Sequence, residues 1–137
     1  FLFAFIGMAK AQTATIDFGT STTQQTYAVA QTLTNTTEKW FQWNCSQAVP
    51  ISLNYSVLLT KGTLSHTETT VQLYGKCFSG DAWVLIDTGT SGTITTTATV
   101  SIKVTTHLQY RYFKTSLVGT GTGTTTITKQ ELKIWLQ

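Results

Sequence analysis

A two-residue alternation of apolar and polar side chains most limits what this chain can fold into. It is clearest between Thr93 and Thr105, where one face carries threonine, serine and lysine and the other face carries Ile94, Ala98, Val100, Ile102 and Val104. Successive side chains of a β-strand point to opposite faces, so this pattern predicts a strand with one buried and one solvated face. The segment 53–60 alternates in the same way.

Turn-forming residues separate the alternating segments at short, regular intervals. We therefore expect about eight or nine strands, near residues 14–18, 26–33, 39–46, 51–60, 68–78, 82–87, 93–106, 109–118 and 124–136. No segment after residue 11 has a helical period with caps. The sequence predicts an all-β fold, an antiparallel β-sandwich of the jelly-roll kind. Residues 82–86 are apolar on both faces, which predicts a central strand there.

The composition is that of one globular domain with an uncharged surface. The chain has 137 residues, of which 41% are hydrophobic and only 11% charged. Threonine occupies 31 positions and covers solvated strand faces without charge. Such a surface is typical of proteins that act outside the cytoplasm or inside a large assembly. We expect an extracellular, secreted or virion location.

The first eleven residues resemble the second half of a secretion signal, with an apolar stretch followed by Ala9-Lys10-Ala11. The stretch is too short for the ~20 residues of a membrane-spanning helix, so we expect no stable transmembrane span. The domain is then 12–137, and residues 1–11 are either cleaved or engaged with a partner. In the second case the interface would include Phe1, Leu2, Phe3, Phe5 and Ile6.

Two cysteines, Cys45 and Cys77, share the parity of apolar neighbours and are expected to point toward the core. They could form one disulfide or remain free buried thiols. An oxidising compartment would favour the disulfide.

One motif has a catalytic counterpart. Residues 84–91, Val-Leu-Ile-Asp-Thr-Gly-Thr-Ser, resemble the signature of aspartic proteases, in which two carboxylates share a proton. A single copy would need a homodimer built around Asp87. The structural interpretation places Asp87 at a junction between a strand and a turn, and we favour it.

No other pattern indicates catalysis or cofactor binding. The Gly-Thr repeat from Gly119 to Thr124 lacks a following helix, so we interpret it as a hairpin and not a phosphate loop. His66 and His107 stand alone, without the spacing of a metal site. We expect no catalytic residues, no metal and no cofactor. The net charge is +3 from scattered lysines, and this pattern does not predict nucleic-acid binding.

Several aromatic residues are out of phase with the core positions of their strands. Trp40 and Trp135 are the main candidates for an interface, and the same class includes Tyr27, Tyr74 and Phe78. Aromatic residues of this kind stack on sugars, fill subunit interfaces or form a second buried face. All three interpretations stay open at this point.

The C-terminal half also carries a set of loose motifs. They are Val71-Gln72-Leu73-Tyr74-Gly75-Lys76, Gly80-Asp81-Ala82-Trp83, Tyr110-Arg111-Tyr112-Phe113-Lys114 and Glu131-Leu132-Lys133-Ile134-Trp135. This half resembles small β-sandwich structural proteins of tailed phages of Bacteroidota, of the capsid-auxiliary, fibre or tail-associated kind. The resemblance implies a virion structural protein and assigns no functional residue.

These observations favour a structural protein of a virion or extracellular surface, without enzymatic activity. We expect it to form a homo-oligomer through sheet edges and aromatic patches, and to contact other virion or surface proteins. A secreted carbohydrate-binding or adhesin module is the alternative, and a homodimeric aspartic protease at Asp87 is the third hypothesis.

Overall fold

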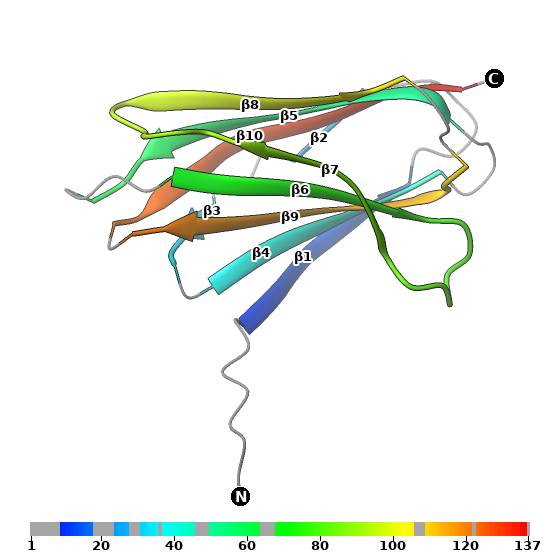
Figure 1. The fold of residues 1–137 in the computed structure, drawn as a ribbon, viewed down its shortest axis with the longest axis horizontal. Helices are drawn as coiled ribbons and strands as arrows, with labels where there is room; N and C mark the ends of the chain where they lie inside the picture. Colours follow the sequence, from blue (N-terminus) through cyan, green and yellow to red (C-terminus); the bar gives the residue numbers. More distant parts are fainter. Residues whose placement is uncertain are drawn as a thin grey trace, which may run out of the picture.

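The computed structural model describes residues 9–17, 24–27, 31–35, 37–45, 50–63, 68–105, 109–121 and 123–136. Within these ranges the chain forms ten β-strands and no helix. The described residues therefore contain no helix long and apolar enough to cross a membrane. The strands form two sheets that face each other (Figure 1). The predicted all-β sandwich is therefore confirmed.

The first sheet has the order β1-β4-β9-β6-β7. Its strands are β1 (Ala9–Asp17), β4 (Thr37–Asn44), β9 (Tyr112–Thr120), β6 (Glu68–Lys76) and β7 (Val84–Thr90). The β1–β4 pair is parallel, which differs from the antiparallel arrangement that we expected throughout, and the other pairs are antiparallel. β1 begins at Ala9, inside the segment expected to resemble a signal, whereas Phe1, Leu2, Phe3, Phe5 and Ile6 lie outside the described residues.

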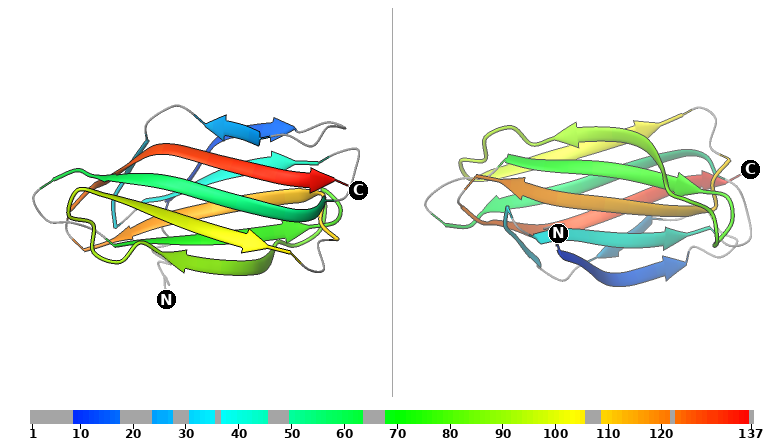
Figure 2. Two further views of the ribbon diagram at one scale, coloured as in Figure 1. Left: turned by 90° about the horizontal axis from the view of Figure 1, so that it is seen from above. Right: turned by 60° about the horizontal axis from the view of Figure 1, so that its bottom comes forward.

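The second sheet has the order β2-β10-β5-β8, with β3 also pairing to β10. Its strands are β2 (Gln24–Tyr27), β10 (Thr125–Leu136), β5 (Pro50–Lys61), β8 (Thr97–Val104) and β3 (Gln31–Leu33). All of its pairs are antiparallel. The two views in Figure 2 show the outer surface of each sheet in turn, with β10 and β5 in the middle of the second sheet.

Two expectations about the arrangement of the strands were wrong, one about the place of a strand in its sheet and one about a connection. The segment 82–87 is not a central strand, because β7 lies at the edge of the first sheet and pairs only with β6 among the described strands. Its apolar residues Val84 and Leu85 are each 49% exposed. The Gly-Thr repeat is not a hairpin either, because it joins β9 of the first sheet to β10 of the second.

The alternation of apolar residues builds the core between the sheets. On β5 the odd-numbered residues 53–59 are fully buried, and on β6 the odd-numbered residues 69–75 are buried. The strand expected at 93–106 begins at Thr97, and Ile94 enters the core from the connection before it. The largest fully buried side chains are Trp43, Tyr55, Phe41, Phe113, Leu33, Leu53, Leu59, Leu73, Ile94, Leu117, Ile127 and Leu132.

A hydrogen bond within the second sheet and a ring contact between the two sheets lie inside this core. The hydroxyl of Tyr55 on β5 donates a 2.7 Å hydrogen bond to Oε1 of Gln130 on β10. The ring of Trp43 on β4 meets the ring of Tyr55 edge-on, with the ring centres 6.3 Å apart. Gln130 faces inward because β10 has a bulge between Ile127 and Lys129 that shifts the parity of the following residues.

Candidate binding face

The outer surface of the first sheet carries aromatic and lysine side chains on three neighbouring strands. The pairing of β6 with β9 sets Tyr74 opposite Lys114 and Lys76 opposite Tyr112. Directly opposite residues share a face of the sheet, so these four side chains lie on one surface. On that surface each tyrosine has a lysine beside it on its own strand and another opposite it on the neighbouring strand. Trp40 of β4 stands opposite Ser116, one step along the sheet. We call Trp40, Tyr74, Lys76, Trp83, Tyr112 and Lys114 the aromatic face.

Lys114 lies at the centre of this face and is only 8% exposed. Its ammonium nitrogen is 4.7 Å from the ring centre of Tyr74, 5.2 Å from that of Trp83 and 5.7 Å from that of Trp40. The negative faces of aromatic rings attract a cation and offset part of the cost of removing it from water. Rings from two strands, β4 and β6, and from the loop before β7 thus converge on one lysine of β9.

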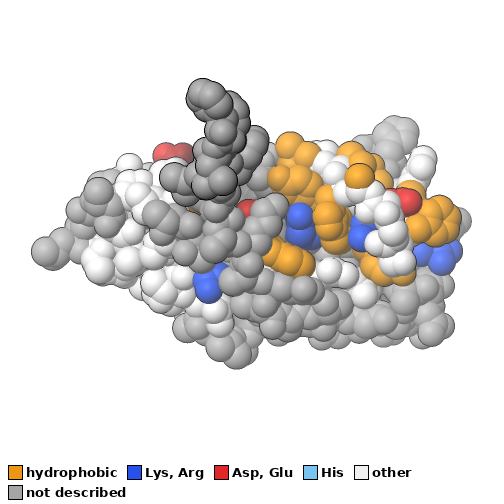
Figure 3. All heavy atoms as spheres, turned by 90° about the horizontal axis from the view of Figure 1, so that it is seen from below, with side chains coloured by type: hydrophobic (Ala, Val, Ile, Leu, Met, Phe, Trp, Pro, Cys, Tyr) orange, Lys and Arg blue, Asp and Glu red, His pale blue; other side chains and the backbone are white. Residues whose placement is uncertain are grey.

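Trp83 comes from the connection between β6 and β7 and links the two lysines. The ammonium of Lys76 is 4.5 Å from the centre of the Trp83 ring and 5.8 Å from that of Tyr112. Lys76 also donates a hydrogen bond to the backbone oxygen of Ser79 in the same connection. Figure 3 shows the result, with lysine atoms set among hydrophobic side chains on this surface.

Polar side chains flank the rings. The amide of Gln42 donates a 3.3 Å hydrogen bond to Asn44, and the Tyr74 hydroxyl donates a 2.8 Å bond to Gln72. Partial burial, and then the nearby negative charge of Glu38, raise the pKa of Tyr74 above its ordinary value. The phenol therefore remains a neutral donor at neutral pH.

An exposed apolar edge adjoins the aromatic face. Among the described residues, the exposed large hydrophobic side chains are Phe78 (72% exposed), Val84 and Leu85. Phe78 lies in the connection that also holds Trp83, and Leu85 stands opposite Tyr74 on the outer surface. We call these three residues the apolar edge.

Two of the predicted interface residues can now be placed. Trp40 belongs to the aromatic face, whereas Trp135 lies on the second sheet, where the ammonium of Lys133 is 5.1 Å from its ring centre. The two tryptophans therefore belong to different surfaces. Sequence reasoning missed Lys76, Trp83, Tyr112 and Lys114. Tyr112 and Lys114 could have been found, because both flank the buried Phe113 in the sequence and must therefore point to the opposite face of the strand.

The cysteines lie on either side of one strand. Cys45 continues β4 and its backbone nitrogen bonds to the oxygen of Arg111, while Arg111 bonds in turn to Lys76, the neighbour of Cys77. Two strand spacings, about 9.5 Å, separate such positions, and a disulfide needs Cα atoms within about 7 Å. Neither thiol is disulfide-bonded in this structure, which corresponds to the second of the two alternatives that the sequence left open for Cys45 and Cys77. Cys45 is buried as expected, but Cys77 is only half-buried.

Asp87 does not lie at a strand-to-turn junction, as we had expected. It lies within β7, exposed, and its carboxylate accepts a 2.8 Å hydrogen bond from the backbone nitrogen of Thr88. The pairing shift beside Leu73 makes Ile86 the extra residue of a β-bulge.

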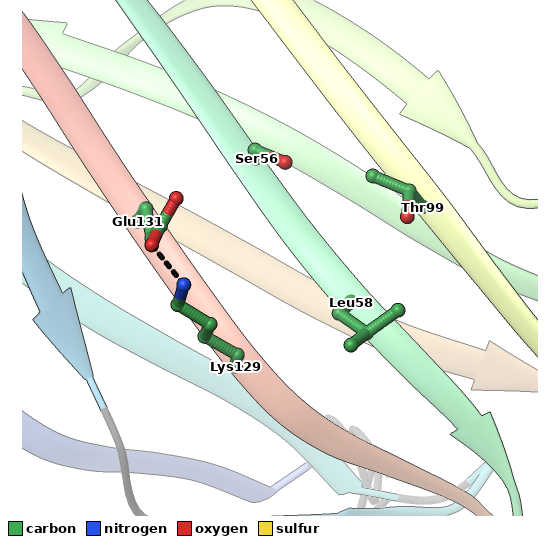
Figure 4. A pocket seen from close by; sticks show the side chains of 5 residues that line it. All are labelled: Ser56, Leu58, Thr99, Lys129 and Glu131. Atoms are coloured by element: carbon green, nitrogen blue, oxygen red, sulfur yellow. Dashed lines mark ion pairs between the residues drawn. The ribbon is translucent and has the colours of Figure 1, made fainter.

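A hollow lies on the outer surface of the second sheet (Figure 4). It has a volume of about 200 Å³ and is lined by Ser56, Leu58, Thr99, Lys129 and Glu131. Lys129 and Glu131, both on β10, form an ion pair along one side of it. It is smaller than the roughly 300–1,000 Å³ of ordinary ligand pockets. Over the described ranges no cluster of metal-ligating residues occurs, and His66 and His107 lie outside them.

Comparison with known proteins shows only the fold. No protein-family model matches the chain, and no curated protein matches its sequence. Among solved structures, the mitogen of Yersinia pseudotuberculosis is similar, with 14% identity and a TM-score of 0.52 over 85% of this chain and 88% of the mitogen chain.

Two larger structures contain a similar sandwich. The infectious bursal disease virus Gx strain matches with 8% identity and a TM-score of 0.52 over 83% of this chain and 32% of the viral one. Dimeric latent PorU from Porphyromonas gingivalis matches with 9% identity and a TM-score of 0.51 over 81% of this chain and 11% of PorU. At such low identities the shared property is the β-sandwich.

Proposed function

We propose that this chain is a structural protein of a virion or an extracellular surface that assembles with itself and with neighbouring surface proteins. The observation that carries the proposal is the apolar edge. Phe78, Val84 and Leu85 fall within eight positions and leave large apolar areas in water. Large apolar side chains left in water at a sheet edge favour contact with a neighbour, because burying them there removes that area from water.

Side-chain packing suits this edge better than the addition of another strand. Natural sheets resist edge-to-edge pairing with bulges and with charged residues on the edge strand. β7 has both, a bulge at Ile86 and the charge of Asp87. Contact through Phe78 and the first residues of β7 avoids both features.

The test compares self-association of the wild-type chain with a triple variant, Phe78→Ser, Val84→Thr and Leu85→Thr, by analytical ultracentrifugation across a concentration series. We expect wild-type oligomers to dissociate in the variant. Leu58→Thr is the matched control, because Leu58 is a half-buried leucine on the outer surface of the other sheet. A wild-type chain that stays monomeric at the highest concentration would contradict the proposal.

We propose further that the chain is not an enzyme. A peptide-library assay from acid to neutral pH should detect no cleavage that depends on Asp87. Cleavage that disappears in Asp87→Asn would instead support the dimeric protease.

A further inference from the structure

The aromatic face combines three kinds of chemistry within a few side chains. Its aromatic rings offer flat apolar surfaces, its two lysines offer positive charge, and the flanking amides of Gln42, Asn44 and Gln72 offer paired donors and acceptors. It adjoins the apolar edge that carries the proposed assembly but shares none of its three residues. A ligand that uses all three groups at once must itself be apolar on one side, hydroxylated and anionic.

The two lysines approach the same aromatic ring. Their ammonium nitrogens lie 4.5 Å and 5.2 Å from the centre of the same Trp83 ring. The separation of the two ammonium nitrogens therefore cannot exceed the sum of these distances, which is below the Debye length of about 10 Å at 0.1 M salt. Salt does not fully screen charges at this separation, so the two lysines repel each other. An anion placed near Trp83 would relieve this repulsion, and its attraction to both charges would add.

Lys76 is the lysine that such an anion can reach. It is half-buried, whereas Lys114 is almost fully buried beneath the rings of Tyr74 and Trp83. No carboxylate among the described residues forms an ion pair with Lys76. Its ring contacts restrict its position in advance, which lowers the entropic cost of pairing with a ligand.

The acidic groups nearby are already engaged or lie further along the face. The carboxylate of Glu38 accepts a hydrogen bond from Ser116, two rows from Lys76 in the pairing of the sheet. The carboxylate of Asp81 accepts a 3.0 Å bond from the backbone nitrogen of Phe78 and closes the turn after β6. Neither carboxylate lies within ion-pair distance of the ammonium nitrogen of Lys76.

We propose that the aromatic face binds an acidic polysaccharide, with sugar rings lying on Trp83 and Tyr74 and a sugar carboxylate paired with Lys76. The apolar C–H face of a sugar matches an aromatic ring, and its hydroxyls match the planar amides. A neutral sugar would leave the positive charges unused. An acidic peptide would use the charges but has no repeating apolar ring for the aromatic side chains.

Binding of hexagalacturonate, measured by isothermal titration calorimetry at near-physiological salt, tests this. Maltohexaose is the neutral comparison and polyglutamate is the peptide comparison. Lys76→Gln removes the ion pair and should weaken hexagalacturonate binding about tenfold, the usual effect of losing one charge-assisted hydrogen bond. Lys103→Gln, on the exposed outer surface of β8, removes the same net charge and should leave binding unchanged.

Trp83 provides a second, independent variant. Trp83→Ala should abolish measurable binding of hexagalacturonate, and Trp83→Phe, which keeps a ring, should restore most of it. Unfolding curves confirm that each variant is folded. Equal effects of Lys76→Gln and Lys103→Gln, equal binding of maltohexaose, tighter binding of polyglutamate, or no binding to any probe would each overturn the proposal. None of these outcomes bears on self-association through the apolar edge.

Discussion

Lys114 stands directly opposite Tyr74 across β9 and β6, with its ammonium nitrogen 4.7 Å from the centre of the tyrosine ring. The lysine is almost fully buried although it belongs to the outer surface of a sheet. The rings of Trp40, Tyr74 and Trp83 all approach its ammonium nitrogen, and their negative faces offset part of the cost of removing it from water. This contact organises the aromatic face.

A double-mutant cycle measures that contact. Tyr74→Leu and Lys114→Met each keep an apolar side chain of similar reach and remove one partner of the cation–π pair. We expect a coupling energy of about 0.5–2 kcal/mol, measured by urea unfolding of the two single variants and the double variant. Strict additivity of the two substitutions would show that the ring and the ammonium do not interact.

The buried hydroxyl of Tyr55 predicts both a stability effect and a pH effect. Tyr55→Phe leaves Oε1 of Gln130 without its donor in the core and should cost about 1–3 kcal/mol of unfolding free energy. Tyr110→Phe is the control, because the Tyr110 hydroxyl forms no hydrogen bond with a described residue, and it should change stability by less than about 0.5 kcal/mol.

Burial raises the pKa of Tyr55 well above its ordinary value of 10.0. The folded chain keeps the phenol neutral, whereas the unfolded chain can ionise it near pH 10. The contribution of the neutral Tyr55 phenol to the unfolding free energy is therefore complete below pH 10, and it is lost as the pH rises above 10. We expect the stability difference between wild type and Tyr55→Phe, followed by urea unfolding, to shrink above pH 10. A constant difference from pH 8 upward would contradict this assignment.

Gly75 is predicted to accept no side chain. A Cβ atom built there would lie 2.6 Å from the ring of Tyr110 and 2.9 Å from Cδ1 of Ile86. Gly75→Ala should therefore lower the unfolding free energy by about 1–3 kcal/mol, as overpacked core substitutions do. Gly80→Ala meets nothing within 4 Å and should be nearly neutral in the same thermal or urea unfolding assay. Two equal effects would mean that the packing around Gly75 is looser than described.

The thiols should react at different rates in the folded chain. Cys45 is fully buried and Cys77 is half-buried, so one thiol should react quickly with Ellman's reagent and both should react in urea. Cys77→Ser should remove the fast reaction and Cys45→Ser should not. A mass two hydrogens lower, with no reactive thiol in urea, would restore the disulfide hypothesis.

The fold class followed from side-chain periodicity because that signal is local. The alternation on 53–59 and 98–104 assigned the buried residues of β5 and β8 correctly, including Tyr55 and Ile102. The same parity argument placed Trp40 and Tyr74 away from the core. Where parity shifts at a bulge, as it does before Gln130, the local pattern no longer identifies the buried side.

Strand order and cross-strand register depended on the tertiary structure. An apolar segment such as Val84–Ile86 has the same composition whether it lies at the centre of a sheet or at its edge, and only the neighbouring strands decide which. Lys114 and Tyr74 are forty positions apart, and nothing local predicts that they meet. Periodicity determines which way a side chain points along its own strand. Its partner is decided by packing and hydrogen bonding between distant segments, which optimise the burial of the whole core.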